Sequence, residues 1–322
     1  MDADESSELA GVKLSHLDQP VFDGAGATKG DLVTYLDAVH ERMLPELRDR
    51  ALSVVRARLG QKPFMQKNLP KYAPPWLQRV TVWAESSHRD VSYALCEDRR
   101  SLLWFANQRA VEYHPTLVLA ERWDRPTYLV LDIDPPPGSP FPTAVSAARL
   151  VAHALTEVGM AGAVKTSGAK GLHVFVPITD TPIEDAAAAT RALAVRAERL
   201  DPALATTAFI REDRGGKVFM DSTRAGGATV VAAYSPRARP GTPVSFPVAW
   251  DDLDQVTPAD FTVRNAAALL GDSDPWAELM PAPQPVAPVL IEEGHSIPVA
   301  RVQAMHEGKR RARAQRAAHE DS

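Results

Sequence analysis

The sequence predicts a mixed α/β or α+β fold, because strand-like and helix-like segments are interspersed along the chain. Residues 128–133 and 172–178 are short apolar runs rich in β-branched and aromatic residues, which is typical of buried strands. Residues 143–158 have helical character and are followed by Gly159, a residue that favours a helix C-terminus. No internal repeat of roughly 20–50 residues is visible, which excludes solenoids and propellers.

Further elements are expected in the first half of the chain. Thr28 and Asp31 have capping-box spacing, and apolar residues at helical intervals follow them, so a helix is predicted there. Pro45 should break or kink it, and we expect a second helix to continue to residue 59. An extended segment is predicted over residues 79–84 and a helix over residues 101–111.

In the second half, Thr181, Pro182 and Glu184 combine a cap, a proline at the first helical position and a capping-box glutamate. They predict a helix that reaches about residue 200, followed by strands over 217–220 and 229–233. We expect four parts: a disordered N-terminus (1–11), a core (12–280), a proline-rich linker (281–295) and a basic C-terminal helix or tail (296–322).

The composition of the 322 residues limits the possible functions. Lys and Arg number 36 and Asp and Glu 41, a net charge of -5, so a nucleic acid would have to be bound in a local groove. The single cysteine, Cys96, excludes a disulfide framework and a Cys-based zinc module. Apolar runs are far shorter than the roughly 20 residues of a membrane helix, and the acidic N-terminus is unlike a signal peptide, so a cytoplasmic protein is expected.

Carboxylates are the first candidate functional groups. Asp132 and Asp134 are separated by one residue on a predicted strand, so both side chains project from the same face. Two like charges so close favour a divalent cation, and hard oxygen ligands suit Mg²⁺ or Mn²⁺. Asp221 ends another predicted strand, and three such carboxylates could hold two ions for phosphoryl transfer. A plain solvated strand end is the alternative explanation for the Asp-x-Asp pair.

Basic and glycine-rich segments are the second group. Residues 167–171 (Ser-Gly-Ala-Lys-Gly) precede a predicted strand, and their amides, Ser167 and Lys170 could bind an anion, although the spacing is not that of a P-loop. His173 at the start of the strand could reach a substrate or a metal. A tight turn and a structural histidine are the alternatives. Three arginines flank Asp221 and suit phosphate: Arg214, Arg237 and Arg239.

In chain order, Asp132-Ile133-Asp134, residues 167–173 and residues 217–221 resemble the three motifs of the archaeo-eukaryotic primase superfamily. A closer resemblance is to the polymerase domain of bacterial ligase D, the end-joining ligase. It extends from about Val12 to Trp250 and includes Thr28-Lys29, Ala73-Pro-Pro-Trp76 and Tyr234-Ser-Pro-Arg237-Ala-Arg239. No ligase or nuclease module fits in the remaining length, so a stand-alone homologue is expected.

The resemblance implies a primase-polymerase catalytic core in which mixed β-sheets form a cleft flanked by helices. It implies that Asp132, Asp134 and Asp221 bind two Mn²⁺ or Mg²⁺ ions. Ser167, Lys170, Arg214 and Arg237 would contact the phosphates of the incoming nucleotide. His114 would lie near its sugar, where a histidine that reaches the 2′-hydroxyl would favour ribonucleotides. His173 occupies the histidine position of the second motif.

The chain also departs from the family pattern. Relatives that grip a downstream 5′-phosphate use an asparagine and two lysines, and the corresponding residues here are His16, Gln19 and Lys29. Of these, Lys29 is placed at a helix N-terminus, where free amides favour phosphate. After the third aspartate the family usually has Trp-Ser-Gln and then a lysine, whereas this chain has Ser-Thr-Arg224, and Arg224 is a possible substitute.

Two other segments are candidates for DNA contact. Phe64, close to Lys67, could stack on template bases. The tail from Arg301 carries six basic residues and could contact phosphates, or it could simply be a solvated helix.

The function predicted from the sequence is template-directed nucleotidyl transfer that fills gaps or extends primers in DNA repair. The expected partners are a DNA primer-template or a gapped or broken duplex, nucleoside triphosphates, and possibly a DNA ligase with end-joining factors. A nucleoid-associated monomer is expected. The alternatives are a primase that starts chains de novo and a catalytically silent DNA-end-binding module that recruits a ligase.

Overall fold

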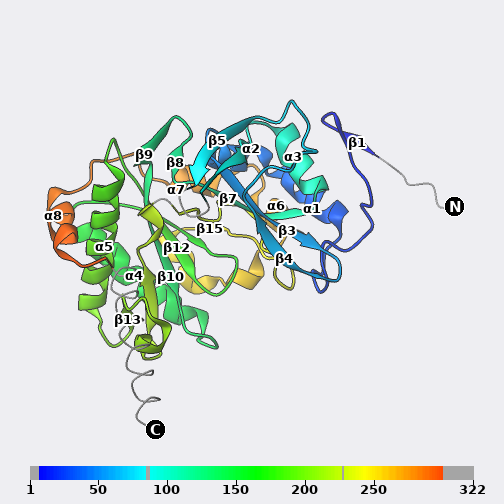
Figure 1. Cartoon of the computed structure of the whole chain (residues 1–322). Coiled ribbons are helices and arrows are strands. Elements are labelled where there is room, and N and C mark those ends of the chain that lie inside the picture. Colours follow the sequence, from blue (N-terminus) through cyan, green and yellow to red (C-terminus); the bar gives the residue numbers. More distant parts are fainter. Residues whose placement is uncertain (1–6, 85–87, 227, 300–322) are drawn as a thin grey trace, which may run out of the picture.

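The computed structural model describes residues 7–84, 88–226 and 228–299. Two large β-sheets form the centre of its fold (Figure 1). The six-stranded sheet consists of β10 (Tyr128–Asp134), β11 (Ala163–Thr166), β12 (Leu172–Pro177), β13 (Ala205–Thr206), β14 (Val218–Asp221) and β15 (Pro247–Val248). Its strand order is β13-β14-β10-β12-β11-β15. All neighbours in it are antiparallel except β13 and β14, so the sheet is mixed.

The second sheet has five strands: β3 (Leu52–Arg58), β4 (Gln61–Gln66), β5 (Arg79–Ala84), β6 (Arg89–Ala94) and β7 (Ala110–Pro115). Strand β3 pairs with β4, β6 and β7. Two short hairpins complete the strands, formed by β1 (Glu8–Leu9) with β2 (Val12–Lys13) and by β8 (Val118–Leu119) with β9 (Arg122–Pro126).

Helices flank both sheets. They are α1 (Lys29–Ala38), α2 (His40–Leu47), α3 (Arg99–Asn107), α4 (Phe141–Glu157), α5 (Ile183–Leu200), α6 (Ala266–Leu270), α7 (Pro275–Leu279) and α8 (Pro288–Ser296). Helices α4 and α5 pack on the six-stranded sheet and α8 packs on α5, whereas α1, α2 and α3 lie beside the five-stranded sheet (Figure 1). Short 3₁₀ turns occur at η1 (Arg211–Arg214), η2 (Arg224–Gly226), η3 (Trp250–Gln255) and η4 (Pro258–Asp260).

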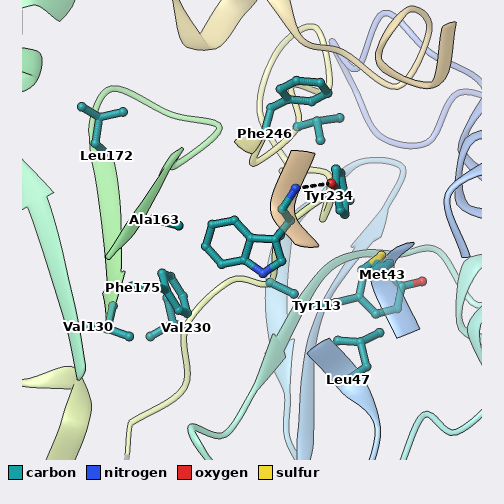
Figure 2. Close-up of a cluster of buried hydrophobic side chains, with 14 of the residues drawn as sticks. Met43, Leu47, Tyr113, Val130, Ala163, Leu172, Phe175, Val230, Tyr234 and Phe246 are labelled. Atoms are coloured by element: carbon teal, nitrogen blue, oxygen red, sulfur yellow. Dashed lines mark hydrogen bonds between the residues drawn. The ribbon is translucent and has the colours of Figure 1, made fainter. Parts of the chain in front are cut away.

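The segment that follows η2 connects the two sheets. The amides of Val230 and Ala232 donate to carbonyl oxygens of β7, at 3.3 and 3.0 Å. Further along, the carbonyl oxygen of Phe246 accepts from the amide of Thr166 on β11, at 2.8 Å. Buried side chains of both sheets, such as Phe175 and Tyr113, belong to one cluster with Tyr234 (Figure 2). The hydroxyl of Tyr234 accepts a hydrogen bond from the backbone amide of Trp276. One hydrophobic core extends from one sheet to the other.

The structure confirms the mixed fold class and several of the expected elements. The Thr28 capping box forms, because Oγ1 accepts from the amide of Asp31 at 3.1 Å while the Asp31 carboxylate accepts from the amide of Thr28 at 2.8 Å. The predicted strands at 79–84, 128–133, 172–178 and 217–220 are present as β5, β10, β12 and β14, with small shifts at their ends. The helices at 143–158 and up to residue 200 are α4 and α5.

Other expectations about the elements were wrong. The first helix ends at Ala38, Pro45 lies inside α2, and residues 52–58 form β3 instead of a helix, because they pair on both sides with other strands. The helix expected over 101–111 ends at Asn107, and β7 begins at Ala110. Residues 229–233 form only one isolated bridge, between Thr229 and Thr116.

The ends of the chain also differ from expectation. Residues 8–13 form a small hairpin, where irregular chain up to residue 11 was expected. The second half of the expected linker is helix α8. Thr181 does not cap α5, because its hydroxyl donates to the carbonyl oxygen of Thr179. Residues 1–6 and the basic tail from residue 300 lie outside the described residues. In the part that is described, no helix is both long and apolar enough to cross a membrane.

Candidate active site

Four polar residues form one row across the six-stranded sheet. Asp132 on β10 stands directly opposite Asp221 on β14 and His173 on β12. His173 in turn stands opposite Lys165 on β11. Directly paired residues of neighbouring strands project from the same face, and Asp134, two residues after Asp132, shares that face. The strand pairing therefore places the three predicted metal-binding carboxylates on one side of the sheet.

Two of these carboxylates converge on a single positive charge. Nη2 of Arg224, in η2, lies 3.0 Å from Oδ2 of Asp132 and 3.2 Å from Oδ2 of Asp221. Oδ1 of Asp221 accepts hydrogen bonds from the amide and the hydroxyl of Thr223, at 2.9 and 2.6 Å. Because Thr223 occupies Oδ1, Oδ2 is the oxygen that Asp221 turns toward Arg224 and Asp132.

The third carboxylate has its own basic partners. Nζ of Lys170 lies 2.9 Å from Oδ1 of Asp134, and Nη1 of Arg214 lies 3.5 Å from Oδ2. The guanidinium of Arg214 rests on the ring of Phe219, 3.7 Å from its centroid, which fixes its plane beside the carboxylate. A pocket of about 180 Å³ opens here, and Arg211 and Lys217 are also in its lining. The pocket is therefore rich in positive charge.

The glycine-rich loop at 167–171 folds tightly against β10. A Cβ on Gly171 would lie 2.0 Å from the carbonyl oxygen of Ile133, so only glycine allows this approach. Oγ of Ser167 accepts from the amides of Ala169 and Gly171, each at 3.2 Å. These two amides bind Ser167 here, so they do not face an external anion. The loop also lines a second pocket of about 360 Å³, together with Arg239.

His173 is supported from behind by a buried lysine. Nζ of Lys165, which is completely buried, donates to Oγ of Ser245 at 2.6 Å and lies 2.9 Å from Nδ1 of His173. Burial, aided by Lys165, lowers the pKa of His173 to about 4. Nζ of Lys165 faces Nδ1, so Nε2 is the ring nitrogen on the side of Asp132, 3.4 Å from its Oδ1. Burial opposes ionisation of Asp132, but His173 and Arg224 outweigh it and keep the pKa of this carboxyl below its usual range.

His114 belongs to a second buried cluster, centred on Glu112. Oε2 of Glu112 lies 2.8 Å from Nε2 of His114 and 3.1 Å from Nε of Arg237, and Oε1 accepts from the amide of Ala238 at 2.9 Å. Arg237 also donates to the carbonyl oxygen of Ser167, which links the cluster to the glycine-rich loop. Burial opposes ionisation of Glu112, but these partners lower its pKa to about 2. Burial lowers the pKa of His114.

Lys29 is the first residue of α1, as the sequence predicts, and His16 and Gln19 lie in the segment before this helix. The amides of Lys29 and Gly30 donate to backbone carbonyls of residues 19 and 17, at 2.8 and 2.7 Å. Nζ of Lys29 donates to the carbonyl oxygen of Ser15 at 2.5 Å, and the side chain is buried. The expectation that the amides at this helix start are free for phosphate was wrong, because the preceding segment binds them.

Phe64 and Lys67 lie on the other sheet. Phe64 is on β4 and is 37% exposed, with the guanidinium of Arg58 5.4 Å from its ring centroid. Lys67 follows the strand and is exposed. The aromatic face and the positive charge are both at the protein surface.

The carboxylates suit a hard divalent cation in their chemistry. Among the described residues, no three Asp, Glu, His or Cys side chains are already arranged as a metal cage. However, Asp132 and Asp221 each direct an oxygen at one cationic nitrogen, and carboxylate oxygens are the ligands that Mg²⁺ and Mn²⁺ prefer. The donor set therefore fits such an ion once Arg224 has moved away.

Comparison with known proteins places this arrangement in a family. A model of the LigD primase-polymerase domain matches residues 28–276. The chain belongs to this family. It is 32% identical to the bifunctional non-homologous end joining protein LigD of Bacillus subtilis over 78% of this chain and 41% of that protein. It is also 32% identical to the multifunctional LigD of Mycobacterium bovis, over 86% of this chain and 38% of the relative.

The solved polymerase domain of Mycobacterium tuberculosis ligase D, in complex with DNA, has the same fold. The TM-score is 0.74 and the identity 31%, over 84% of this chain and 99% of that domain. The chain thus matches 99% of the solved polymerase domain, but spans only about two fifths of the curated LigD proteins.

Three residues of the site were missed by the sequence analysis: Glu112, Lys165 and Thr223. Glu112 is two residues before His114 and therefore on the same face of β7, so strand alternation from that histidine could have indicated it. Lys165 could be recognised only from the pairing of β11 with β12, because its partner His173 is on the other strand. Thr223 has the spacing of a hydroxyl that bonds the carboxylate two residues before it.

Proposed function

We propose that this protein is a template-directed nucleotidyltransferase that fills short gaps or extends primers in DNA during end-joining repair. One observation carries the proposal. Asp132 and Asp221, on paired strands, direct one oxygen each at a single cation, and Asp134 shares their face of the sheet. Membership of a primase-polymerase family and similarity to a polymerase domain in complex with DNA support it.

In this proposal Asp132, Asp134 and Asp221 hold two Mn²⁺ or Mg²⁺ ions. Such ions lower the pKa of a primer 3′-hydroxyl and neutralise charge on a triphosphate. The protein holds Asp221 in position by hydrogen bonds from Thr223, and Nε2 of His173 lies 3.4 Å from Oδ1 of Asp132.

Basic side chains around the carboxylates would bind the nucleotide phosphates. Lys170 and Arg214 flank Asp134 at the mouth of the smaller pocket, where they would stabilise negative charge that develops during transfer. Arg239 lines the larger pocket beside the glycine-rich loop. Ser167 belongs to that loop, and Arg237 donates to its carbonyl oxygen. Arg224 is a further phosphate ligand in this proposal.

The sugar would be recognised by His114. Because Oε2 of Glu112 accepts the proton of Nε2, Nδ1 of His114 is an acceptor. A ribose 2′-hydroxyl can donate to such an atom and a deoxyribose cannot, which favours ribonucleotides. Glu112 is thus a positioning residue for this preference.

DNA would contact two other regions. His16, Gln19 and Lys29 form the proposed 5′-phosphate contact, with His16 exposed on the surface. Phe64 would stack on a template base while Lys67 binds the backbone. A role in end joining would place the protein at the nucleoid, next to a DNA ligase and end-joining factors.

Primer extension with carboxylate variants tests the proposal. Asp132→Ala and Asp221→Ala should each reduce templated extension by about 10³-fold or more, with little change in DNA affinity. Asp254→Ala is the matched control, because that aspartate pairs with Arg149 on the surface. Wild-type extension by Asp132→Ala would refute the site assignment.

A catalytically silent DNA-end-binding module is the second candidate. The observation that favours it is the cation already present between Asp132 and Asp221, which an enzyme has to remove before an ion can bind there. Tight binding to gapped DNA without any nucleotide addition, in Mn²⁺ and in Mg²⁺, would support this candidate.

A further inference from the structure

Arg224 occupies a position between two carboxylates that the proposed function assigns to metal. Its Nη2 contacts one oxygen of each, at 3.0 Å from Asp132 and 3.2 Å from Asp221. The other oxygen of each carboxylate has a different partner, Thr223 for Asp221 and His173 for Asp132. The two inward-facing oxygens therefore mark one site for positive charge, and the guanidinium fills it.

A guanidinium and a divalent ion exclude each other at this site. Mg²⁺ binds oxygen at about 2.1 Å, so an ion held by both Oδ2 atoms needs the space of Nη2. The site is only partly exposed, with 21% of the Asp132 side chain and 11% of the Asp221 side chain accessible, so repulsion between two cations there would be weakly screened. Arg224 has to leave before the ion can bind.

Arg224 is free enough to move, and an alternative partner would be close. Its side chain is 35% exposed, against 15% for Arg237 in the buried Glu112 cluster. Lys170 and Arg214, the proposed phosphate ligands, flank Asp134, which follows Asp132 by two residues, or about 7 Å along an extended strand. A triphosphate bound there would present anionic oxygens to a displaced guanidinium.

We propose that Arg224 is an exchangeable counterion that couples metal binding to nucleotide binding. Without nucleotide it neutralises Asp132 and Asp221 and opposes the entry of a divalent ion. With nucleotide it transfers to a phosphate oxygen and releases the carboxylates to the metal. Because coupling between two ligands is reciprocal, the nucleotide strengthens metal binding as much as the metal strengthens nucleotide binding. This inference rests on the proposed function for the identity of the metal ligands.

A Mn²⁺ titration of the full chain without DNA tests the coupling, with free Mn²⁺ measured by its electron paramagnetic resonance signal. Without nucleotide, Arg224→Gln should bind Mn²⁺ about tenfold more tightly than the wild type, a size typical of coupled sites. A non-hydrolysable ribonucleoside triphosphate should strengthen Mn²⁺ binding in the wild type and do so much less in Arg224→Gln.

Three controls make the result decisive. Arg149→Gln removes a surface Arg–Asp pair and should behave as the wild type. Arg224→Lys keeps the charge and should keep most of the coupling, which provides a second variant if Arg224→Gln folds poorly. Asp132→Asn should lose the Mn²⁺ site whether residue 224 is Arg, Gln or Lys.

Unchanged or weaker Mn²⁺ binding by Arg224→Gln without nucleotide would overturn the inference, as would an equal nucleotide effect in the two proteins. The titration requires no turnover, so it remains informative even if the wild type fails to extend a primer. Failure of extension would then count against the proposed function, while the Mn²⁺ result would stand on its own.

Discussion

At the scale of single residues, the site is a set of charges that are already compensated. Each of the three carboxylates has a basic partner from another element: Arg224 for Asp132 and Asp221, and Lys170 with Arg214 for Asp134. Carboxylates so close would otherwise repel one another at a partly buried position. The metal-free protein therefore has no need of an ion to hold these side chains together.

Glu112 gives a sharp prediction about hydrogen bonding. Its two oxygens accept from two different donors, Nε2 of His114 and the amide of Ala238. In Glu112→Gln the side chain keeps only one acceptor oxygen. When that oxygen still accepts from the backbone amide of Ala238, the side-chain NH₂ group faces Nε2 of His114. The proton of the ring should then move to Nδ1. Nitrogen-15 NMR of His114 measures this, and the preference for ribonucleotides should fall in parallel.

An unchanged His114 tautomer in Glu112→Gln would contradict the positioning role. Glu121→Gln is a suitable control, because it replaces an exposed glutamate for which no ion pair is seen within the described residues.

Acid should also destabilise the fold through this cluster. The pKa of Glu112 is about 2 in the folded protein, below its ordinary value of 4.5, so the unfolded chain binds the proton more readily. The stabilisation is complete above about pH 4.5 and is lost as the pH falls toward 2, with a maximum of about 3 kcal/mol. Urea unfolding at several pH values measures it. If the wild type and Glu112→Gln lose the same free energy of unfolding over this range, the cluster is not responsible.

At the scale of elements, local signals predicted those parts whose own sequence decides their conformation. The apolar runs of β10 and β12 and the long helices α4 and α5 belong to this class, as does the Thr28 cap of α1. Strand β3 does not belong to this class. Its Ala, Arg and Leu residues favour a helix locally, and only pairing with β4 and β7 makes it a strand. Helix α8 was not predicted, because its segment is rich in proline and indicated a linker. Its packing on α5 explains why a helix forms there.

The contact between α8 and α5 depends on one glycine. A Cβ on Gly294 would lie 1.9 Å from the carbonyl oxygen of Ala188, so Gly294→Ala must push the helices apart. We expect a loss of about 2 kcal/mol or more in the free energy of unfolding. Urea denaturation measures it, with Glu292→Ala as the control at an exposed position of the same helix. Equal stability of the two variants would show that this packing is different in solution.

The candidate site combines features that the sequence predicts with others that it does not. The spacing of Asp132 and Asp134 predicts their common face, and the family resemblance identifies Asp221. The place of Arg224 between two carboxylates and the burial of Lys165 behind His173 depend on strand register, which a sequence does not specify. The bonded amides at the start of α1 depend likewise on the fold of the preceding segment.

At the scale of the whole molecule, one hydrophobic core connects both sheets, and Asp132, Asp134 and Asp221 lie on strands of the six-stranded sheet. The carboxylates are balanced by protein cations, so stability should not depend on metal. We expect the melting temperature in excess chelator to lie within about 2 °C of that in Mn²⁺ without nucleotide. Circular dichroism melting curves measure this. Unfolding at room temperature in chelator would show that an ion is part of the native fold.

The most direct test of the central claim is single-nucleotide addition to a short gapped duplex, with Mn²⁺ and Mg²⁺ used separately and with ribo- and deoxyribonucleotides compared. The account predicts addition only of the nucleotide complementary to the template, faster with the ribonucleotide, and lost in Asp132→Ala. Tight binding without addition under every condition, or addition that persists in Asp132→Ala, would contradict it.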